Sequence, residues 1–241
     1  SKTHLFSRVK QSSVAALGVT FGIGAYIILM SFMTGLNGML DSLVTNTTIK
    51  DDLLYHFTMH YVSRSKSEKN SNAILKYYLS KTNSEKGKEH LVRYTSSLNR
   101  LKVGSKIPEI VLINFDNKEV NLNAVINQPT VINFWSNIYF DHFKDSHYRI
   151  KELIEKYPEV EFVSINIDGF NMDQLTKTLM INKFESKNEF VFKDPQKTSE
   201  ELAIYPMNKT IILDKNKEIV NNNINIFSIY FEKQLLGLIN K

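Results

Sequence analysis

The 241-residue chain is 42% hydrophobic and 11% aromatic, which is the composition of a folded protein and excludes a disordered one. Its 30 basic and 25 acidic residues give a net charge of +5 without a basic stripe, so the sequence does not predict nucleic-acid binding. Cysteine is absent, which excludes disulfides, thiol catalysis and cysteine metal ligands.

An uncharged segment lies near the start of the chain, from Gln11 to Leu40. Its apolar density is highest between Val14 and Leu36, which is long enough for the roughly 20 residues that a helix needs to cross a bilayer. A cleaved signal peptide and a buried core helix are alternatives, but the run is longer than a signal's apolar region and lacks a convincing cleavage site. We expect one N-terminal transmembrane helix.

The charges on either side of this run predict its orientation. Lys2, Arg8 and Lys10 precede it, whereas the first basic residue after it is Lys50. The positive-inside rule then places the N-terminus in the cytoplasm and the remainder of the chain across the membrane. We expect an inner-membrane protein whose C-terminal domain faces the periplasm.

The stretch from Leu5 to Val44, "LFSRVKQSSVAALGVTFGIGAYIILMSFMTGLNGMLDSLV", resembles the first transmembrane segment of FtsX-like ABC transporter permeases of the macrolide-exporter and lipoprotein-release type. Such permeases have further membrane helices, and no second run of this kind follows. The resemblance therefore does not imply a complete transporter subunit. It supports an alternative interpretation, a permease fragment joined near residues 44–51 to a separate protein by fusion or in an assembly chimera.

A polar connector with helical periodicity follows, over residues 51–102. Apolar residues recur at helical spacing in three groups: Leu53, Leu54 and Phe57; Ile74, Leu75, Tyr78 and Leu79; and Leu91, Tyr94 and Leu98. The polar stretches between them are typical of turns or exposed helix starts. We expect a small helical subdomain between the segment 1–50 and a third domain, residues 103–241.

Three histidines in the connector raise the question of a metal site. His56 and His60 have the i, i+4 spacing that places two zinc ligands on one helix face, and His90 is a third histidine nearby in the sequence. No glutamate stands beside His56, and the aromatic neighbours indicate packing. We predict no metal and no other cofactor.

Short β-type runs alternate with helical ones from Lys106 onward. The predicted elements are two strands in "IPEIVLINFDNKEVNL" joined at 116–118, the buried strands "TVINFW" and "VEFVSINID" on either side of the helix "DHFKDSHYRIKELIEKYP", a helix in "MDQLTKTLMINKF", a short strand "EFVFKD", the strands "KTIILD" and "EIVNNN", and a closing helix "IYFEKQLLGLIN". Buried strands joined through helices imply a parallel part, and the last hairpin adds antiparallel strands. The fold class is α/β.

This order of elements, with Trp135 at the end of the first buried strand, resembles the TlpA/ResA-like thioredoxin family over Val103 to Lys241. The resemblance rests on "VGSKIPEIVLINFDNKEVNL", "PTVINFW", "VEFVSINID" and "TIILDKNKEIV". It implies a thioredoxin-like fold, a mixed sheet flanked by helices. The helical connector also resembles the region that often precedes this domain in Bacteroidetes-type members.

The family reacts through the two cysteines of a Trp-Cys-x-x-Cys motif, and the matching residues here lack thiols. Ser136 and Tyr139 stand at the cysteine positions, with Asn137 and Ile138 between them. Neither a serine hydroxyl nor a tyrosine can exchange a disulfide. The resemblance therefore implies the fold of a thiol-disulfide oxidoreductase without its activity.

The family's cis-proline loop also differs in this chain. Counted back from Asp214, the proline position is occupied by Asn208, and Pro206 lies two residues upstream. A cis bond before a residue other than proline costs about 2.5–4 kcal/mol. We expect a trans bond and an altered loop.

Ser136 could act as a nucleophile of another kind only with a base beside it. The nearest histidines in the sequence, His142 and His147, are five residues apart and so lie roughly 140° apart around a helix. We expect Ser136 to cap the helix that follows instead. On that helix, Lys151 and Glu155 have i, i+4 spacing on a face expected to be solvated.

Because the motif lacks thiols and Ser136 is expected to be a helix cap, we expect the domain to act in binding or as a structural module. We expect the retained surface to be a rim around the motif, formed by Trp135, Asn137, Ile138, Tyr139, Phe140 and Asn208. Aromatic side chains suit contact with a peptide or an envelope protein because they supply a large area at low entropic cost. Burial of these aromatics is the alternative.

Overall fold

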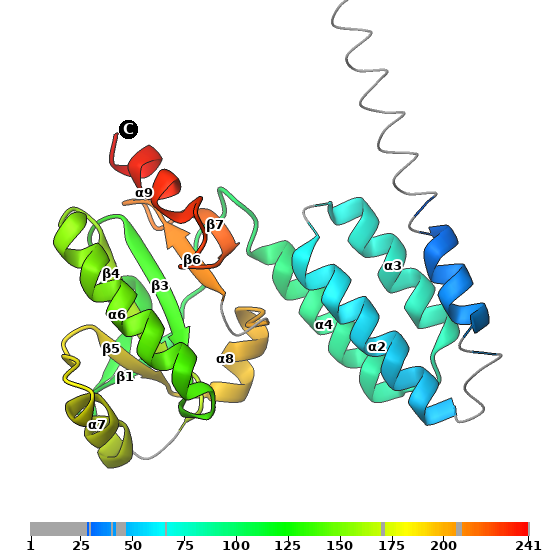
Figure 1. The fold of residues 1–241 in the computed structure, drawn as a ribbon, viewed down its shortest axis with the longest axis horizontal. Helices are drawn as coiled ribbons and strands as arrows, with labels where there is room; N and C mark the ends of the chain where they lie inside the picture. The colour runs from blue at the N-terminus through cyan, green and yellow to red at the C-terminus, as the bar shows by residue number, and fades with distance from the viewer. Residues whose placement is uncertain are drawn as a thin grey trace, which may run out of the picture. The chain divides into compact units, whose positions relative to one another are not determined.

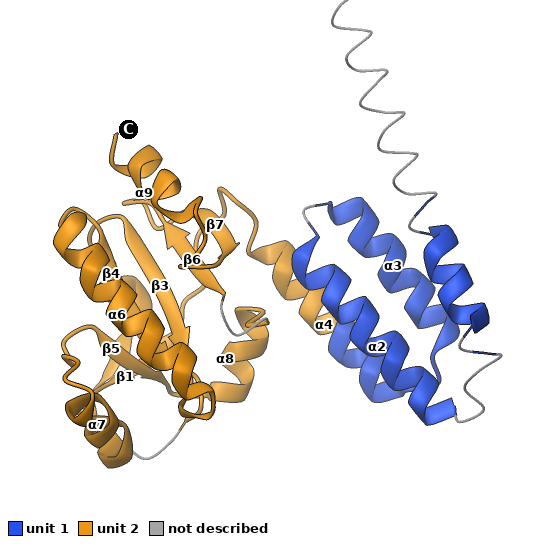
Figure 2. Cartoon of the chain, in the orientation of Figure 1, with its two compact units in different colours: residues 1–91 blue, residues 92–241 orange. Residues whose placement is uncertain are grey.

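The computed structural model describes residues 28, 30–39, 41, 47–65, 67–169, 172–205 and 209–240. The chain divides into two compact units, residues 1–91 and 92–241 (Figure 2). Most of the uncharged run lies outside the described residues, as does part of the junction at 44–51. In the part of the chain that the structure describes, no helix combines the length and the hydropathy needed to cross a bilayer. The predicted domain boundaries at 50/51 and 102/103 stay predictions.

Three helices follow the uncharged run, as the connector's periodicity predicts (Figure 1). They are α2 (Thr47–Arg64), α3 (Glu68–Lys81) and α4 (Glu85–Arg100), and α4 begins in the first unit and ends in the second. Ser67 caps α3 because its side chain accepts a hydrogen bond from the Asn70 amide. The helices bury one apolar stripe each, and Leu54, Ile74, Tyr78 and Leu91 are wholly buried.

A seven-stranded mixed sheet forms the centre of the second unit, in the order β2-β1-β5-β4-β3-β6-β7 (Figure 1). The strands are β1 (Val111–Asn114), β2 (Glu119–Asn121), β3 (Thr130–Trp135), β4 (Glu161–Asn166), β5 (Glu189–Phe192), β6 (Thr210–Leu213) and β7 (Ile219–Ile224). The pairs β3–β4 and β4–β5 are parallel, and the other neighbours are antiparallel. The β1–β2 turn contains Asn117 at φ 60°, which asparagine tolerates better than most residues.

Helices flank this sheet. They are α5 (Leu122–Val125), η1 (Asn137–Tyr139), α6 (Phe140–Lys156), α7 (Met172–Ile181), α8 (Pro195–Glu201) and α9 (Phe231–Ile239). One core cluster joins α6 and α9 to the sheet through Ile150, Leu153, Phe231, Leu235, Val131, Phe162 and Ile212. A second cluster joins α6 and α7 to the end of β3 through Trp135, Phe143, Leu175, Leu179 and Val191. The second cluster lies directly beneath the motif.

Candidate functional site

The motif after β3 is held by a carboxylate that follows the neighbouring strand. The two strands are parallel and Trp135 pairs with Asn166, so the residues after both strands meet at one edge of the sheet. The Ser136 hydroxyl donates to Asp168 Oδ1 at 2.6 Å, and the Asn137 amide donates to Asp168 Oδ2 at 2.6 Å. Asp168 thus closes the turn on which the motif sits.

Ser136 is a helix cap, but it caps the 3-10 helix η1 and not α6, the helix for which the sequence predicted it; α6 begins after Tyr139, which makes no side-chain cap hydrogen bond. The Ser136 side chain accepts a hydrogen bond from the Ile138 amide at 3.0 Å, at the start of η1 and directly before α6. The carboxylate of Asp168 lies at the same helix end, where a negative charge is favoured by the helix dipole. In the TlpA/ResA-like family this is the place of the reactive thiolate.

Neither histidine of α6 serves Ser136 as a base. Both ring nitrogens of His142 are buried without a hydrogen-bond partner among the described residues, and burial lowers the pKa of this imidazole. His147 is bonded elsewhere, to the Phe143 carbonyl and to Glu189. Among the described residues, Ser136 therefore forms no serine–histidine pair, and its hydroxyl is bound to Asp168 instead.

A buried polar chain lies under the motif. The Trp135 indole Nε1 donates to Glu189 Oε2 at 2.9 Å, and His147 Nε2 lies 3.1 Å from Glu189 Oε1. All three side chains are buried. The sequence did not predict these hydrogen bonds, because Glu189 is 54 residues from Trp135. An isolated glutamate at the start of a short strand is also expected to be exposed to solvent.

Hydrogen-bond geometry ties His147 and Glu189 to each other. His147 Nδ1 lies 2.7 Å from the Phe143 carbonyl, which can only accept a hydrogen bond. His147 Nε2 lies 3.1 Å from Glu189 Oε1, so the two ionisable side chains are paired with each other in the interior.

The residues expected to form a rim divide into buried and exposed ones. Trp135 is not part of the surface, because its side chain is fully buried against Phe143. Ile138, Tyr139 and Phe140 are 73%, 55% and 46% exposed. Asn137 is half-buried. The proline-loop matches Pro206 and Asn208 lie outside the described residues, so the altered loop stays a prediction.

A buried lysine stands next to that loop. Lys209 is 1% exposed, and its ammonium donates to the carbonyls of Leu202 and Ala203 at 2.6 and 3.0 Å, just beyond the C-terminus of α8. Burial lowers its pKa to about 7. No sequence pattern predicted burial at this position, because lysine is almost never fully buried.

Two of the three connector histidines have hydrogen-bond partners within the first unit, and the third has a ring contact. His90 Nδ1 lies 2.8 Å from the Tyr55 hydroxyl, and His60 Nδ1 lies 2.9 Å from Arg64 Nη1. His56 packs edge-on against the Tyr55 ring. Among the described residues, no group of three or more potential metal ligands occurs.

Comparison with known proteins shows a likeness in fold. No family model and no curated protein matches the chain. A candidate thiol-disulfide oxidoreductase from Bacteroides vulgatus has a TM-score of 0.50 at 16% identity, over 58% of this chain and 98% of that one. The thioredoxin domain of a thiol-disulfide oxidoreductase from the same species has a TM-score of 0.48 at 16% sequence identity, and the match covers 58% of this chain and 99% of that one. A candidate thiol:disulfide interchange protein DsbE from Chlorobium tepidum has a TM-score of 0.47 at 19% sequence identity, and the match covers 58% of this chain and 96% of that one.

The first of these likenesses supports the predicted fold class. The second unit has a thioredoxin-like α/β fold, with a mixed sheet and flanking helices. The neighbours are named for thiol-disulfide chemistry, whereas this chain contains no cysteine. The likenesses do not test the predicted membrane helix or the permease resemblance.

Proposed function

We propose that the chain is a membrane-tethered, redox-inactive thioredoxin-fold module that binds a peptide segment of an envelope protein through Ile138, Tyr139 and Phe140. The observation that carries this proposal is the contrast within one turn of chain. The Ser136 hydroxyl and the Asn137 backbone amide are bound internally by Asp168, whereas the side chains of Ile138, Tyr139 and Phe140 that follow project into solvent.

The geometry of these three side chains supports binding. Adjacent exposed apolar residues at one helix end mark interaction sites more often than scattered ones do. Phe140 is held in place, because its ring packs 5.8 Å from that of Phe143 and the Lys144 ammonium lies 5.7 Å from it. An aromatic that is already ordered loses little entropy when a partner binds.

The absence of cysteine supports the redox-inactive part of the proposal. Thiol-disulfide exchange needs a thiolate at the helix N-terminus, and there Ser136 donates its hydrogen to Asp168 instead. The Ser136 hydroxyl closes the turn through this hydrogen bond. The motif then contributes a binding surface and no nucleophile for disulfide exchange.

The tether and the periplasmic location rest on the sequence alone. They are supported by the uncharged run over 11–40 and by the basic residues that precede it. The permease resemblance of residues 5–44 supports a membrane segment of the same kind. The fusion or assembly chimera is the competing proposal for this segment.

A matched pair of double variants tests the binding surface. Ile138→Ser with Tyr139→Ser removes most of it, whereas Ile229→Ser with Tyr230→Ser changes the same residue types at positions that are 85% and 64% exposed before α9. Chemical cross-linking in the cell envelope, with quantitative mass spectrometry, measures the partners. We expect the first variant to lose about tenfold or more of the principal partner and the second to retain it. An equal partner set for both variants would refute the peptide-binding surface.

A further inference from the structure

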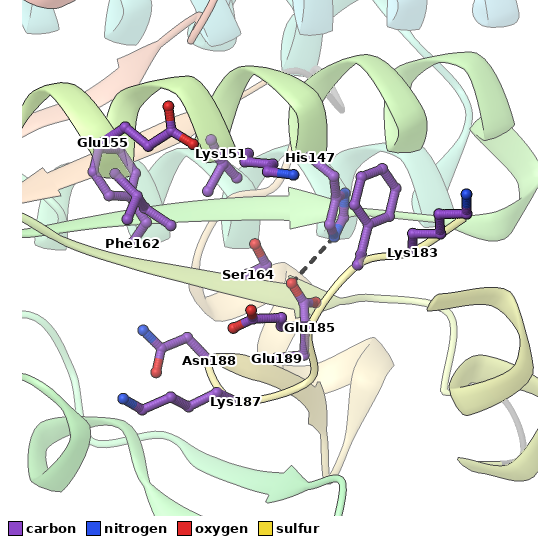
Figure 3. Close-up of a pocket in the computed structure, with 13 residues that line it drawn as sticks. His147, Lys151, Glu155, Phe162, Ser164, Lys183, Glu185, Lys187, Asn188 and Glu189 are labelled. Atoms are coloured by element: carbon purple, nitrogen blue, oxygen red, sulfur yellow. Dashed lines mark hydrogen bonds and ion pairs between the residues drawn. The ribbon is translucent and has the colours of Figure 1, made fainter. Parts of the chain in front are cut away.

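A pocket of about 410 Å³ lies further along α6, away from the exposed residues of the motif. Figure 3 shows it between α6, which contributes His147, Lys151 and Glu155, the strand β4 with Phe162 and Ser164, and the segment 183–189 before and at the start of β5. Its volume is within the range of sites for small molecules. Neither the motif nor the proposed peptide surface uses it.

The pocket has apolar walls and a polar floor. Ile150, Phe162 and Phe184 supply the walls. Ser164, His147 and Glu189 supply the floor, and all three are buried. His147 and Glu189 are already paired with each other there. A ligand's charge would accordingly be matched at the mouth and not at the floor, because burying an uncompensated charge is costly.

The mouth carries more basic than acidic side chains. Lys151, Lys183 and Lys187 stand there with Glu155 and Glu185, and all five are exposed. In the described part of the chain, none of the three lysines has an ion-pair partner, and the i, i+4 pair expected between Lys151 and Glu155 is not formed. Other lysines of this unit are paired, for example Lys156 with Glu232 and Lys193 with Glu119. The three lysines are thus available to a ligand.

Lys183 occupies a backbone position that disfavours it. Its φ is 59°, and it follows α7 where the Phe184 amide bonds back to the Leu179 carbonyl. Glycine is the usual residue at such a helix end, because a side chain there is strained. A lysine at this place costs stability, and the pocket offers a reason for having it.

We propose that this pocket binds a small organic anion with an apolar or aromatic body. The anionic group lies at the mouth, where Lys151, Lys183 and Lys187 stand at different sides (Figure 3), and the body packs on Ile150, Phe162 and Phe184. This pocket is separate from the peptide-binding surface of the proposed function, so an experiment can refute one of the two proposals without affecting the other.

The probe is 8-anilinonaphthalene-1-sulfonate, and N-phenyl-1-naphthylamine serves as the same ring system without the charge. The chain's single tryptophan, Trp135, lies 5.4 Å from the His147 ring at the pocket floor, so quenching of its emission reports binding at this place. We expect the full-length protein to bind the sulfonate more tightly than the neutral probe. Tighter binding of the neutral probe, or binding without quenching, would overturn the proposal.

Two sets of variants locate the charge effect. Replacing Lys151, Lys183 and Lys187 by Gln is expected to weaken binding of the sulfonate about tenfold and binding of the neutral probe less than about twofold. The matched control replaces Lys118, Lys215 and Lys233 by Gln, three exposed lysines outside the pocket, and should leave both affinities unchanged. Equal weakening by both triple variants would show a general charge effect and refute the site.

Lys183→Gly separates binding from folding. Glycine relieves the strained φ, so the thermal midpoint should stay the same or rise. The affinity for the sulfonate should nevertheless fall about two- to threefold, because one lysine is lost. An unchanged affinity would remove Lys183 from the site, and a lower thermal midpoint would contradict the argument from strain.

Discussion

At the scale of single residues, the indole of Trp135 is held by groups that are distant in the sequence. Its N–H donates to Glu189, its ring packs 4.7 Å from that of Phe143, and His147 approaches it edge-on at 5.4 Å. In the family that the motif resembles, this residue precedes the reactive cysteine. In this chain it is a core residue that fixes a buried pair of ionisable groups.

The buried contact between His147 and Glu189 leads to a prediction about stability. Glu189→Leu leaves the Trp135 N–H and His147 without their partner and should lower the free energy of unfolding by about 3–5 kcal/mol. His147→Leu should also destabilise, and the double variant should cost less than the sum of the two. Urea unfolding followed by Trp135 emission would give a coupling energy of about 1.5–3 kcal/mol.

An exposed ion pair supplies the control for this cycle. Lys193 and Glu119 are both largely exposed, so the same double-mutant cycle on them should give a coupling energy below about 1 kcal/mol. If the buried and the exposed pair gave similar coupling energies, the buried contact beneath Trp135 would contribute no more to stability than a surface ion pair.

At the scale of elements, one carboxylate connects α9 to α6. Glu232 in the first turn of α9 accepts hydrogen bonds from Arg149 Nη2 at 2.6 Å and from the Tyr157 hydroxyl at 2.7 Å, and it also contacts Lys156. The hydrogen bonds from Lys156, Tyr157 and Arg149 lower the pKa of Glu232 to about 2. The apolar side of α9 packs independently through Phe231 and Leu235.

The lowered pKa of Glu232 sets a pH dependence. Because the folded state holds this carboxylate ionised, its contribution is complete above about pH 5 and is lost as pH falls toward 2. Glu232→Gln should lower the free energy of unfolding by about 1 kcal/mol at pH 7 and by much less near pH 2. Urea midpoints of both proteins across this range would show it.

Glu152→Gln is the matched control for this prediction. Glu152 binds the same Arg149 from α6 itself, but it is more exposed than Glu232, and among the described residues its ion pair is with Arg149 alone. Its replacement should change stability by less than about 0.5 kcal/mol. A pH-independent effect of Glu232→Gln would contradict the assignment.

At the scale of the whole molecule, the proposed tether predicts where the chain is found. The full-length protein should stay in the membrane pellet after an alkaline wash, and protease added to spheroplasts should digest its C-terminal domain. Ile27→Arg with Leu29→Arg places two charges in the uncharged run and should shift the protein to the soluble fraction. Recovery of the C-terminal domain only as a shorter, soluble chain would favour the chimera instead.

The sequence by itself determined the elements of the second unit and the absence of cysteine from the motif. Period-two and buried runs predicted β3, β4, β6 and β7, and helical spacing predicted α6, α7 and α9, because burial of apolar side chains follows local periodicity. The cysteine count shows directly that these 241 residues carry no thiol. A capping role for Ser136 was also predictable, because serine is favoured at the start of a helix, but the element that it caps is η1 and not α6.

Only the tertiary structure decided which polar residues act together. Asp168 reaches Ser136 because two parallel strands end at one edge, and Glu189 reaches Trp135 from a strand 54 residues later in the chain. Lys209 is buried because its ammonium finds two carbonyls beyond the end of α8. Charged residues read as exposed in any local pattern, since the partners that satisfy them in the interior are supplied by the fold and not by their neighbours in sequence.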